Sequence, residues 1–362
     1  MLKIAKMINT IITGTGKFVP ENIIKNSHFL NHKFYDENGD RLPKTNKEII
    51  DKFEEITTIA ERRYSDSDMV SSDMGYLASL KAIEDAGIDK EELDYILVAH
   101  NFGDVREGNI EVDIVPTIAS RIKHKLGIEN PYCVAYDVPF GCPGWLQAFI
   151  QADYYIKSGD AKKILIIGAE TLSRVIDPHD IDGMLYADGA GATIIEARDS
   201  DAIKGVLAHL TRSDTKDHMS LLTMGRSNNL ELRKKDKIYI KMQGRKVYIY
   251  AISEVPNAIK KTLEKANRDL SEVKRIFIHQ ANGKMDDAMV DRLYKMYKLP
   301  KPEFIMPMTV QEYGNSSVAT LPTLLDIVKH DEKENYDIQE GDLVVFASVG
   351  AGMNINAMAY QF

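Results

Sequence analysis

Short apolar segments alternate with amphipathic segments along most of the chain. Residues 142–158 predict a helix, because their apolar side chains recur at helical spacing and the pattern stops at Gly159, a common residue just past a helix end. The runs typical of buried strands are Tyr95–Ala99, Ile164–Gly168, Ala192–Ile195, Ile276–Ile278 and Leu343–Ala347. This alternation predicts an α/β fold with buried strands.

The chain also resembles itself. The segment LKAIEDAGIDKEELDYILVAH from Leu80 and the segment KKTLEKANRDLSEVKRIFIHQ from Lys260 both read as helix, short connection and buried strand. Chance similarity remains an alternative, because this pattern is common. A second pair, Gly141–Cys142 and Gly314–Asn315, precedes two predicted helices in the same order, which favours a duplication. We expect an N-terminal half at residues 7–200 and a C-terminal half at residues 201–362.

The composition argues against several classes of protein. The 362 residues are 44% hydrophobic, which suffices for a large core, and no apolar run is long enough to predict a membrane span. The two cysteines, Cys133 and Cys142, cannot form a disulfide framework, so we expect a cytoplasmic protein without a signal peptide. The net charge of −8 argues against general nucleic-acid binding, and no metal-ligand spacing predicts a metal site.

Candidate chemistry begins at Cys142, which opens the predicted helix in FGCPGW. Free N–H groups at a helix start favour a thiolate and lower the thiol pKa, so Cys142 is a candidate nucleophile that could accept an acyl group as a thioester. A buried, inert thiol is the alternative, and it is the interpretation we keep for Cys133 in its apolar run.

Two further residues complete a possible site. His279 in IFIHQAN follows a predicted strand, and Asn315 in YGNSS follows a glycine. Each alone could be structural, as a buried histidine or a helix N-cap. Together with Cys142 they suit an enzyme that decarboxylates a malonyl-type donor and stabilises the resulting enolate through His and Asn donors. The glycine-rich segment Ser348–Gly352 could bring a backbone N–H close to Cys142.

Motifs over nearly the whole chain resemble β-ketoacyl-acyl-carrier-protein synthase III, a branch of the thiolase superfamily. They are ITGTGKFVPENII, KAIEDAGI, AYDVPFGCPG, GAETLSRVIDP, ADGAGATI, KMQGRKVY, IHQAN, YGNSS and VGAGMNINAMAYQF. The resemblance implies a duplicated, five-layered αβαβα fold and a homodimer. It also implies acyl-CoA and acyl-carrier-protein thioesters as substrates without a bound cofactor, in fatty-acid or specialised lipid and polyketide biosynthesis.

By this resemblance Cys142 is the nucleophile, and His279 and Asn315 hold the donor thioester carbonyl. The backbone N–H groups of Cys142 and Ala351 would form the oxyanion hole, with Ala351 at a position that is usually glycine. Arg174 and Lys284 fall where the family places basic residues near the coenzyme A or carrier phosphates. Lys284 replaces a usual arginine, which keeps the charge and loses the bidentate fork.

Other positions depart from the family pattern. Lys52 or Phe53 stands at the place of an adenine-stacking tryptophan, and a usual arginine is lost near Ile56. The loop Asn101–Pro116 is longer than usual, and its Val115 replaces a bulky aromatic that closes the acyl pocket from the partner subunit. These departures favour longer, branched or carrier-bound acyl groups over an acetyl-CoA primer, as in relatives that serve specialised lipid, aryl-polyene or dialkylresorcinol pathways.

Three alternatives share this fold. An acyltransferase would pass the Cys142 acyl group to an alcohol or amine. A condensation without decarboxylation, as in hydroxymethylglutaryl-CoA synthase, would need a glutamate base that the sequence does not place. A catalytically inert half of a heterodimer would need no chemistry, and the intact Cys–His–Asn set argues against it.

Overall fold

Two β-sheets carry the fold. The computed structural model describes residues 7–109, 111–200, 202–234 and 237–362. The first sheet has the strand order β1-β7-β6-β4-β5 and the second β11-β12-β13-β8. Their bounds are β1 Met7–Phe18, β4 Tyr95–Ala99, β5 Val134–Val138, β6 Lys163–Thr171, β7 Asp188–Ser200, β8 Gly205–Ser213, β11 Val273–Ile278, β12 Leu343–Gly350 and β13 Asn354–Gln361.

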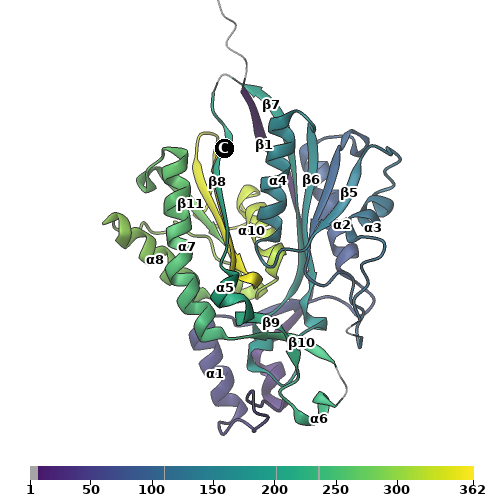
Figure 1. The fold of residues 1–362 in the computed structure, drawn as a ribbon, viewed down its shortest axis with the longest axis vertical. Helices are drawn as coiled ribbons and strands as arrows, with labels where there is room; N and C mark the ends of the chain where they lie inside the picture. Colours follow the sequence, from purple (N-terminus) through teal and green to yellow (C-terminus); the bar gives the residue numbers. More distant parts are fainter. Residues whose placement is uncertain (1–6, 110, 201, 235–236) are drawn as a thin grey trace, which may run out of the picture.

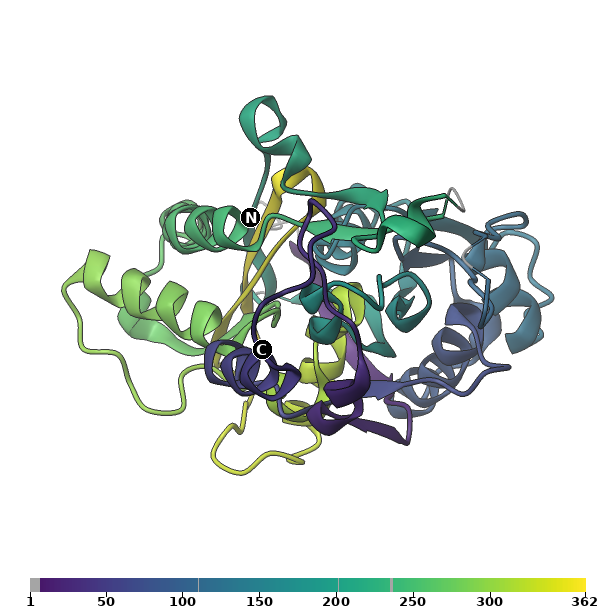
Figure 2. The ribbon, with the colours of Figure 1, turned by 90° about the horizontal axis from the view of Figure 1, so that it is seen from below.

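Within the described residues, the main helices and the sheets stack in five layers (Figure 1). Helices α2 and α3 cover the outer face of the first sheet, α4 and α10 lie between the sheets, and α7 and α8 cover the second sheet on the opposite flank (Figure 2). The bounds are α2 Ser71–Ala86, α3 Ile118–Leu126, α4 Gly144–Ser158, α7 Gly244–Ala266, α8 Gly283–Tyr297 and α10 Thr320–Lys329. The predicted αβαβα arrangement is confirmed.

The two sheets repeat one plan. In the first sheet β4 runs parallel to β6, and β6 pairs antiparallel with β7. In the second sheet β11 runs parallel to β12, which pairs antiparallel with β13. In each sheet one of these parallel strands follows a long outer helix, α2 before β4 and α7 before β11. This is the pair of helix–strand units that the sequence repeat predicts.

Smaller elements gather at one end of the layers. They are β2 Asn22–Lys25, β3 Glu61–Tyr64, α1 Asn46–Thr57, α5 Thr215–His218, β9 Leu222–Arg226, α6 Leu230–Arg233, β10 Ile238–Met242 and α9 Val310–Tyr313. Short 3₁₀ helices are η1 Asn26–Asn31, η2 Lys90–Glu92, η3 Leu172–Arg174, η4 Ile181–Leu185, η5 Met219–Leu221, η6 Leu270–Glu272, η7 Ser317–Ala319 and η8 Ala351–Met353. Figure 1 shows α1, α6 and the β9–β10 hairpin together at the lower end.

Burial explains which elements the sequence predicts. Every apolar run named as a strand lies in a strand, and each of those strands is mostly buried. Strand β5 was not among them, because Val134 is exposed and the next three residues are only half-buried at the edge of the sheet. Helix α4 ends before Gly159, whose φ of +83° suits a residue without a side chain.

The expected division into halves stays a prediction. The first sheet ends with Ser200 and the second begins with Gly205, while residue 201 lies outside the described residues. Of the helices that the described residues form, none combines the length and apolar character needed to span a bilayer.

A buried arginine joins several of the smaller elements to one another. Arg62 of β3 is fully buried and donates hydrogen bonds to the carbonyl of Met184 (3.1 Å), the carbonyl of Ile24 (2.9 Å) and Asn26 Oδ1 (2.6 Å). Burial lowers its pKa to about 10, so the guanidinium remains charged at neutral pH. A cation in the core is tolerated here because its donors are used.

We therefore expect Arg62→Met to destabilise the protein by about 3 kcal/mol, because buried acceptors lose their partners. The shift in the urea-unfolding midpoint measures this loss. Arg198→Met is the matched control, since the Arg198 side chain is 58% exposed and pairs with Glu196 at the surface. Equal midpoints for the two variants would contradict a structural role for Arg62.

Candidate active site

Cys142 lies at the start of α4, directly after the turn that follows β5. Its sulfur accepts a hydrogen bond from the hydroxyl of Ser317, with 3.3 Å between Oγ and Sγ. Burial raises the pKa of the thiol to about 11, the Ser317 bond acts to lower it, and the nearby Glu170 carboxylate raises it further. This direction is opposite to the lowering expected from the helix start, because desolvation outweighs it. The free thiol is therefore mostly protonated at neutral pH.

His279 follows the last residue of β11 and extends its ladder, since its backbone N–H donates to the carbonyl of Ala347 at 2.9 Å. The side chain is 2% exposed. Burial lowers the pKa of His279 to about 4, and a hydrogen bond to the backbone of Ser317 only partly offsets this. The imidazole is therefore neutral at physiological pH and can donate from one ring nitrogen.

Asn315 is held by backbone bonds on both sides. Its N–H donates to Leu185 O, and its carbonyl accepts from the N–H of Ala187, each at 2.9 Å. The side-chain Oδ1 accepts from the N–H of Ser317 at 2.8 Å. That bond orients the carboxamide oxygen toward Ser317, so the Nδ2 hydrogens point the other way.

The turn before Asn315 depends on Gly314. Its φ of +68° and ψ of −164° form a conformation that favours glycine. A methyl group there would also lie 2.7 Å from Cβ of Arg62, too close for real side chains. The Asn315 position is thus set by the same buried arginine that orders the smaller elements.

Ser317 brings the three predicted residues together. Its hydroxyl contacts the Cys142 sulfur, its N–H contacts the Asn315 side chain, and its backbone bonds His279. The sequence analysis did not single it out, although it stands two residues after Asn315 in the quoted YGNSS motif. Its φ of +52° is uncommon for serine and shows how tightly the turn is constrained.

The glycine turn after β12 approaches the same cysteine. A methyl group on Gly350 would lie 2.6 Å from the backbone nitrogen of Cys142, and one on Gly141 would lie 2.9 Å from that of Ala351. The backbones of Cys142 and Ala351 are therefore neighbours, as the glycine-rich segment suggested. Their use as an oxyanion hole stays a prediction.

A small, mostly apolar pocket opens beside the sulfur. It has a volume of about 180 Å³, and its walls come from both the β5–α4 side and the β9–β10 hairpin. Apolar walls are supplied by Phe102, Leu172, Tyr186, Met224 and Ile240, with Cys142, Ser317 and Ala351 also lining it. Its character suits the acyl chain of a thioester.

A buried acid that the sequence analysis missed bonds Asn101, one of the residues that line this pocket. Glu170, the eighth residue of β6, is fully buried, and its Oε1 accepts from the backbone N–H (2.9 Å) and the Nδ2 of Asn101. Burial raises the pKa of Glu170 to about 8. The quoted GAETLSRV motif contains this residue, but nothing in the sequence indicates its burial.

The two residues expected near phosphates lie elsewhere. Arg174 is 9% exposed, and its guanidinium donates to Asp66 O at 2.7 Å and pairs with Glu107 at 3.0 Å. Lys284, in the first turn of α8, lines a separate hollow of about 440 Å³ with Thr58 and Lys301. Neither is among the described residues that line the Cys142 pocket, and their phosphate-binding role stays a prediction.

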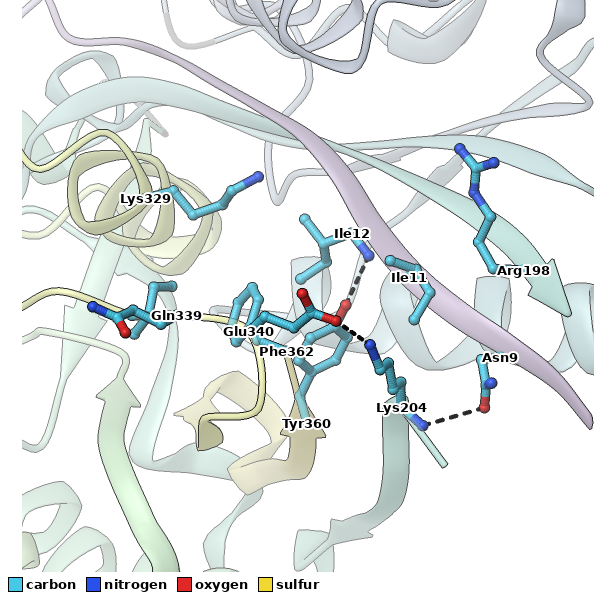
Figure 3. A pocket seen from close by; sticks show the side chains of 11 residues that line it. Asn9, Ile11, Ile12, Arg198, Lys204, Lys329, Gln339, Glu340, Tyr360 and Phe362 are labelled. Atoms are coloured by element: carbon cyan, nitrogen blue, oxygen red, sulfur yellow. Dashed lines mark hydrogen bonds and ion pairs between the residues drawn. The ribbon is translucent and has the colours of Figure 1, made fainter. Parts of the chain in front are cut away.

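Another hollow, also of about 440 Å³, lies between the two sheets at the far end of β13 (Figure 3). There the hydroxyl of Tyr360 accepts from the N–H of Ile12 at 2.7 Å, and Lys204 pairs with Glu340. Among the described residues that line it there is no Cys, His or Ser. This hollow lies between the two sheets and is separate from the candidate active site.

Comparison with known proteins agrees with this geometry. The family model of 3-oxoacyl-[acyl-carrier-protein] synthase III matches residues 136–214, and its C-terminal counterpart matches residues 263–362. β-Ketoacyl-[acyl-carrier-protein] synthase III of Staphylococcus aureus strain Newman is 33% identical over 98% of this chain and 99% of its own. The strain JH1 protein is 32% identical over the same shares.

Solved structures show the same fold. The 3-oxoacyl-[acyl-carrier-protein] synthase III of Aquifex aeolicus superposes with a TM-score of 0.77 at 26% identity, covering 98% of this chain and 100% of that one. The priming β-ketosynthase of the R1128 polyketide pathway reaches a TM-score of 0.80 at 24% identity, over 100% and 98%. With identity above 30% along both full lengths and the predicted thiolase-like fold confirmed, the chain belongs to the β-ketoacyl-acyl-carrier-protein synthase III family of condensing enzymes.

Proposed function

We propose that this protein loads an acyl group on Cys142 and condenses it with a malonyl- or β-ketoacyl-type thioester, in fatty-acid or specialised lipid and polyketide biosynthesis. The meeting of Cys142, His279 and Asn315 around Ser317, next to a small apolar pocket, carries the proposal. The relatives' names, which specify β-ketoacyl synthesis on an acyl carrier protein, support it.

In the loading step the Cys142 thiolate attacks the thioester carbonyl of an acyl-CoA or acyl carrier protein. A new C–S bond forms, the old one breaks, and the proton that Cys142 gives up to become a thiolate ends on the leaving thiolate. The negative oxygen of the tetrahedral intermediate would accept from the N–H groups of Cys142 and Ala351, which lie in neighbouring backbone segments.

In the condensing step His279 and the Nδ2 of Asn315 would donate to the carbonyl oxygen of the donor thioester. Loss of CO₂ then leaves an enolate whose charge these donors stabilise. The enolate carbon attacks the acyl carbon on Cys142, and the cysteine thiolate leaves. At physiological pH the imidazole is neutral and carries a single N–H, which is the hydrogen that it would donate to the oxygen of the donor thioester.

Observations in the site weigh against the alternatives. Simple transfer to an alcohol or amine needs no pair of donors for an enolate, yet His279 and Asn315 are both positioned by Ser317. Condensation without decarboxylation needs a base beside the donor, and the buried Glu170 carboxyl group is held by two hydrogen bonds from Asn101. A catalytically inert subunit of a heterodimer would not need Cys142, His279 and Asn315 to be held together around Ser317.

Substrate and partner contacts follow from the same proposal. We place the carrier or coenzyme A phosphates near Lys284, which lines the hollow beside α8. Arg174 could bind a phosphate only if it gave up its ion pair with Glu107, whose side chain is 61% exposed.

The free thiols of Cys133 and Cys142 agree with a cytoplasmic location. Residues 7–200 would form the nucleophile half, and residues 201–362 the half carrying His279 and Asn315.

We further propose a homodimer that forms along β5. This strand is at an edge of the first sheet among the described strands. Large apolar side chains beside that edge are exposed, with Tyr132 at 85%, Val134 at 48% and Val115 at 84%. An unpaired apolar edge is a ready pairing surface, and Val115 of one subunit would then face the acyl pocket of the other.

The loading step predicts a covalent adduct. Incubating the protein with a panel of acyl-CoA and acyl-carrier thioesters should add one acyl mass, and Cys142→Ala should abolish it. Cys133→Ala should retain the adduct, because that thiol is 1% exposed and is not among the described residues that line the pocket. Mass spectrometry of the intact protein reads the result. Without an adduct from any donor, the nucleophile assignment fails.

The condensing step separates the roles of the donors from that of Cys142. His279→Ala and Asn315→Ala should still form the adduct, while CO₂ release from malonyl carrier protein falls by about 100-fold or more. His209→Ala, a half-buried histidine of β8, is the control. In the wild-type protein, burial lowers the pKa of His279 to about 4, so this residue stays neutral between about pH 5.5 and 8. Its titration should therefore not change the rate of CO₂ release over that range. Wild-type CO₂ release by both variants would refute the assignment.

The proposed homodimer along β5 predicts the molecular mass of the protein in solution. Light scattering of wild-type protein should give about twice the 40.8 kDa of one chain, and Val134→Asp should shift it toward the monomer. Ile203→Asp is the matched control, an exposed apolar residue outside β5. A wild-type monomer, or a dimer untouched by the charge on β5, would disprove this interface.

A further inference from the structure

A chain of hydrogen bonds runs from a buried carboxyl group to the Cys142 sulfur. Glu170 Oε1 accepts from the backbone N–H and from the Nδ2 of Asn101. The same Nδ2 donates to Ser317 Oγ at 3.1 Å, and the Ser317 hydroxyl donates to Cys142 Sγ at 3.3 Å. Three strand ends and the turn before α10 thus meet through side chains from distant parts of the chain.

The number of hydrogens on each group sets the direction of this chain. The amide nitrogen of Asn101 has two hydrogens, and the two acceptors are Glu170 and Ser317. The serine hydroxyl has one hydrogen, and because its oxygen already accepts from Asn101, that hydrogen is left for the sulfur. A flipped amide would turn its oxygen toward the Glu170 oxygen, so the carboxyl group fixes the amide orientation.

We propose that Glu170 and Asn101 are positioning residues that hold the Ser317 hydroxyl as a hydrogen-bond donor to the Cys142 sulfur and so govern how readily the thiolate forms. The inference rests on the proposed nucleophilic role of Cys142. It matters because the half-buried thiol is largely desolvated, and a donor to the sulfur offsets part of the cost of forming the anion.

The charge of Glu170 adds a second influence. Burial and the nearby Asp188 raise the pKa of Glu170, while the bonds from Asn101 lower it, and the result is about 8. Once ionised, Glu170 opposes the thiolate and raises the pKa of Cys142. The other titratable groups that face these residues are Tyr186 beside Cys142 and His279 against Ser317. Thiolate formation should therefore become harder as Glu170 loses its proton.

Alkylation of Cys142 by iodoacetamide tests this without any acyl substrate. The thiolate displaces iodide, a C–S bond replaces the C–I bond, and the rate reports the thiolate fraction. Mass spectrometry of the Cys142 peptide from the native full-length protein, sampled between pH 6 and 9.5, measures it. We expect Ser317→Ala and Asn101→Ala to slow the reaction about tenfold at pH 7, the loss expected for one hydrogen bond to a charged group.

Glu170→Gln keeps an oxygen for Asn101 and removes the charge. It should match wild type at pH 6.5 and react about threefold faster at pH 9, where wild-type Glu170 is ionised. Glu196→Gln is the matched control, a buried acid on β7 that pairs with Lys163 and Arg198, and should reproduce the wild-type profile. A purely structural role would not change the shape of the pH profile.

Each result decides a separate claim. Wild-type rates in both Asn101→Ala and Ser317→Ala would overturn the positioning proposal, and a Glu170→Gln profile that superimposes on wild type would overturn the charge effect of Glu170. The first two variants remove no charge, so they test the positioning proposal even where Glu170→Gln fails to fold. Native Cys142 that resists alkylation, while unfolded protein reacts, would instead refute its nucleophilic role. If the alkylation rates change as expected but no acyl adduct forms, the proposed substrate would be refuted. The positioning roles of Glu170 and Asn101 would still be supported.

Discussion

The close approach of the Gly350–Gly352 turn to the backbone of Cys142 is the contact on which the rest of the site depends. A methyl group on Gly350 would lie 2.6 Å from the Cys142 nitrogen, so a larger residue would push the two segments apart. This contact joins the end of β12 in the second sheet to the helix that follows β5 in the first. Because the backbones meet there, Ser317, which bonds both Asn315 and His279, also reaches the Cys142 sulfur.

Desolvation by the same enclosure sets the resting protonation of the site. It raises the pKa of Cys142 to about 11 and lowers that of His279 to about 4, so both groups are neutral before reaction. In the proposed reaction, charge then appears on the sulfur and on thioester oxygens as the steps proceed. Donors that are already oriented need little rearrangement when it does, which is the usual source of electrostatic catalysis.

The layered fold makes this arrangement rigid. Helices α4 and α10 lie between the sheets, and α10 is buried from Thr320 to Val328. The residues just before each helix, Cys142 and the Asn315–Ser317 turn, therefore face each other from two elements that cannot shift independently. Family membership accounts for this frame.

The sequence by itself determined the elements whose side chains are fully buried, and it predicted Cys142, His279 and Asn315 as candidate reacting residues. It predicted the strands from apolar runs and the end of α4 from Gly159, because burial and backbone conformation restrict residue types locally. Only the tertiary structure decided that Glu170, Asn101 and Ser317 connect, that Arg174 is enclosed, and that desolvation dominates the Cys142 pKa. These depend on contacts between segments far apart in the chain, and no local pattern encodes the distance between such segments.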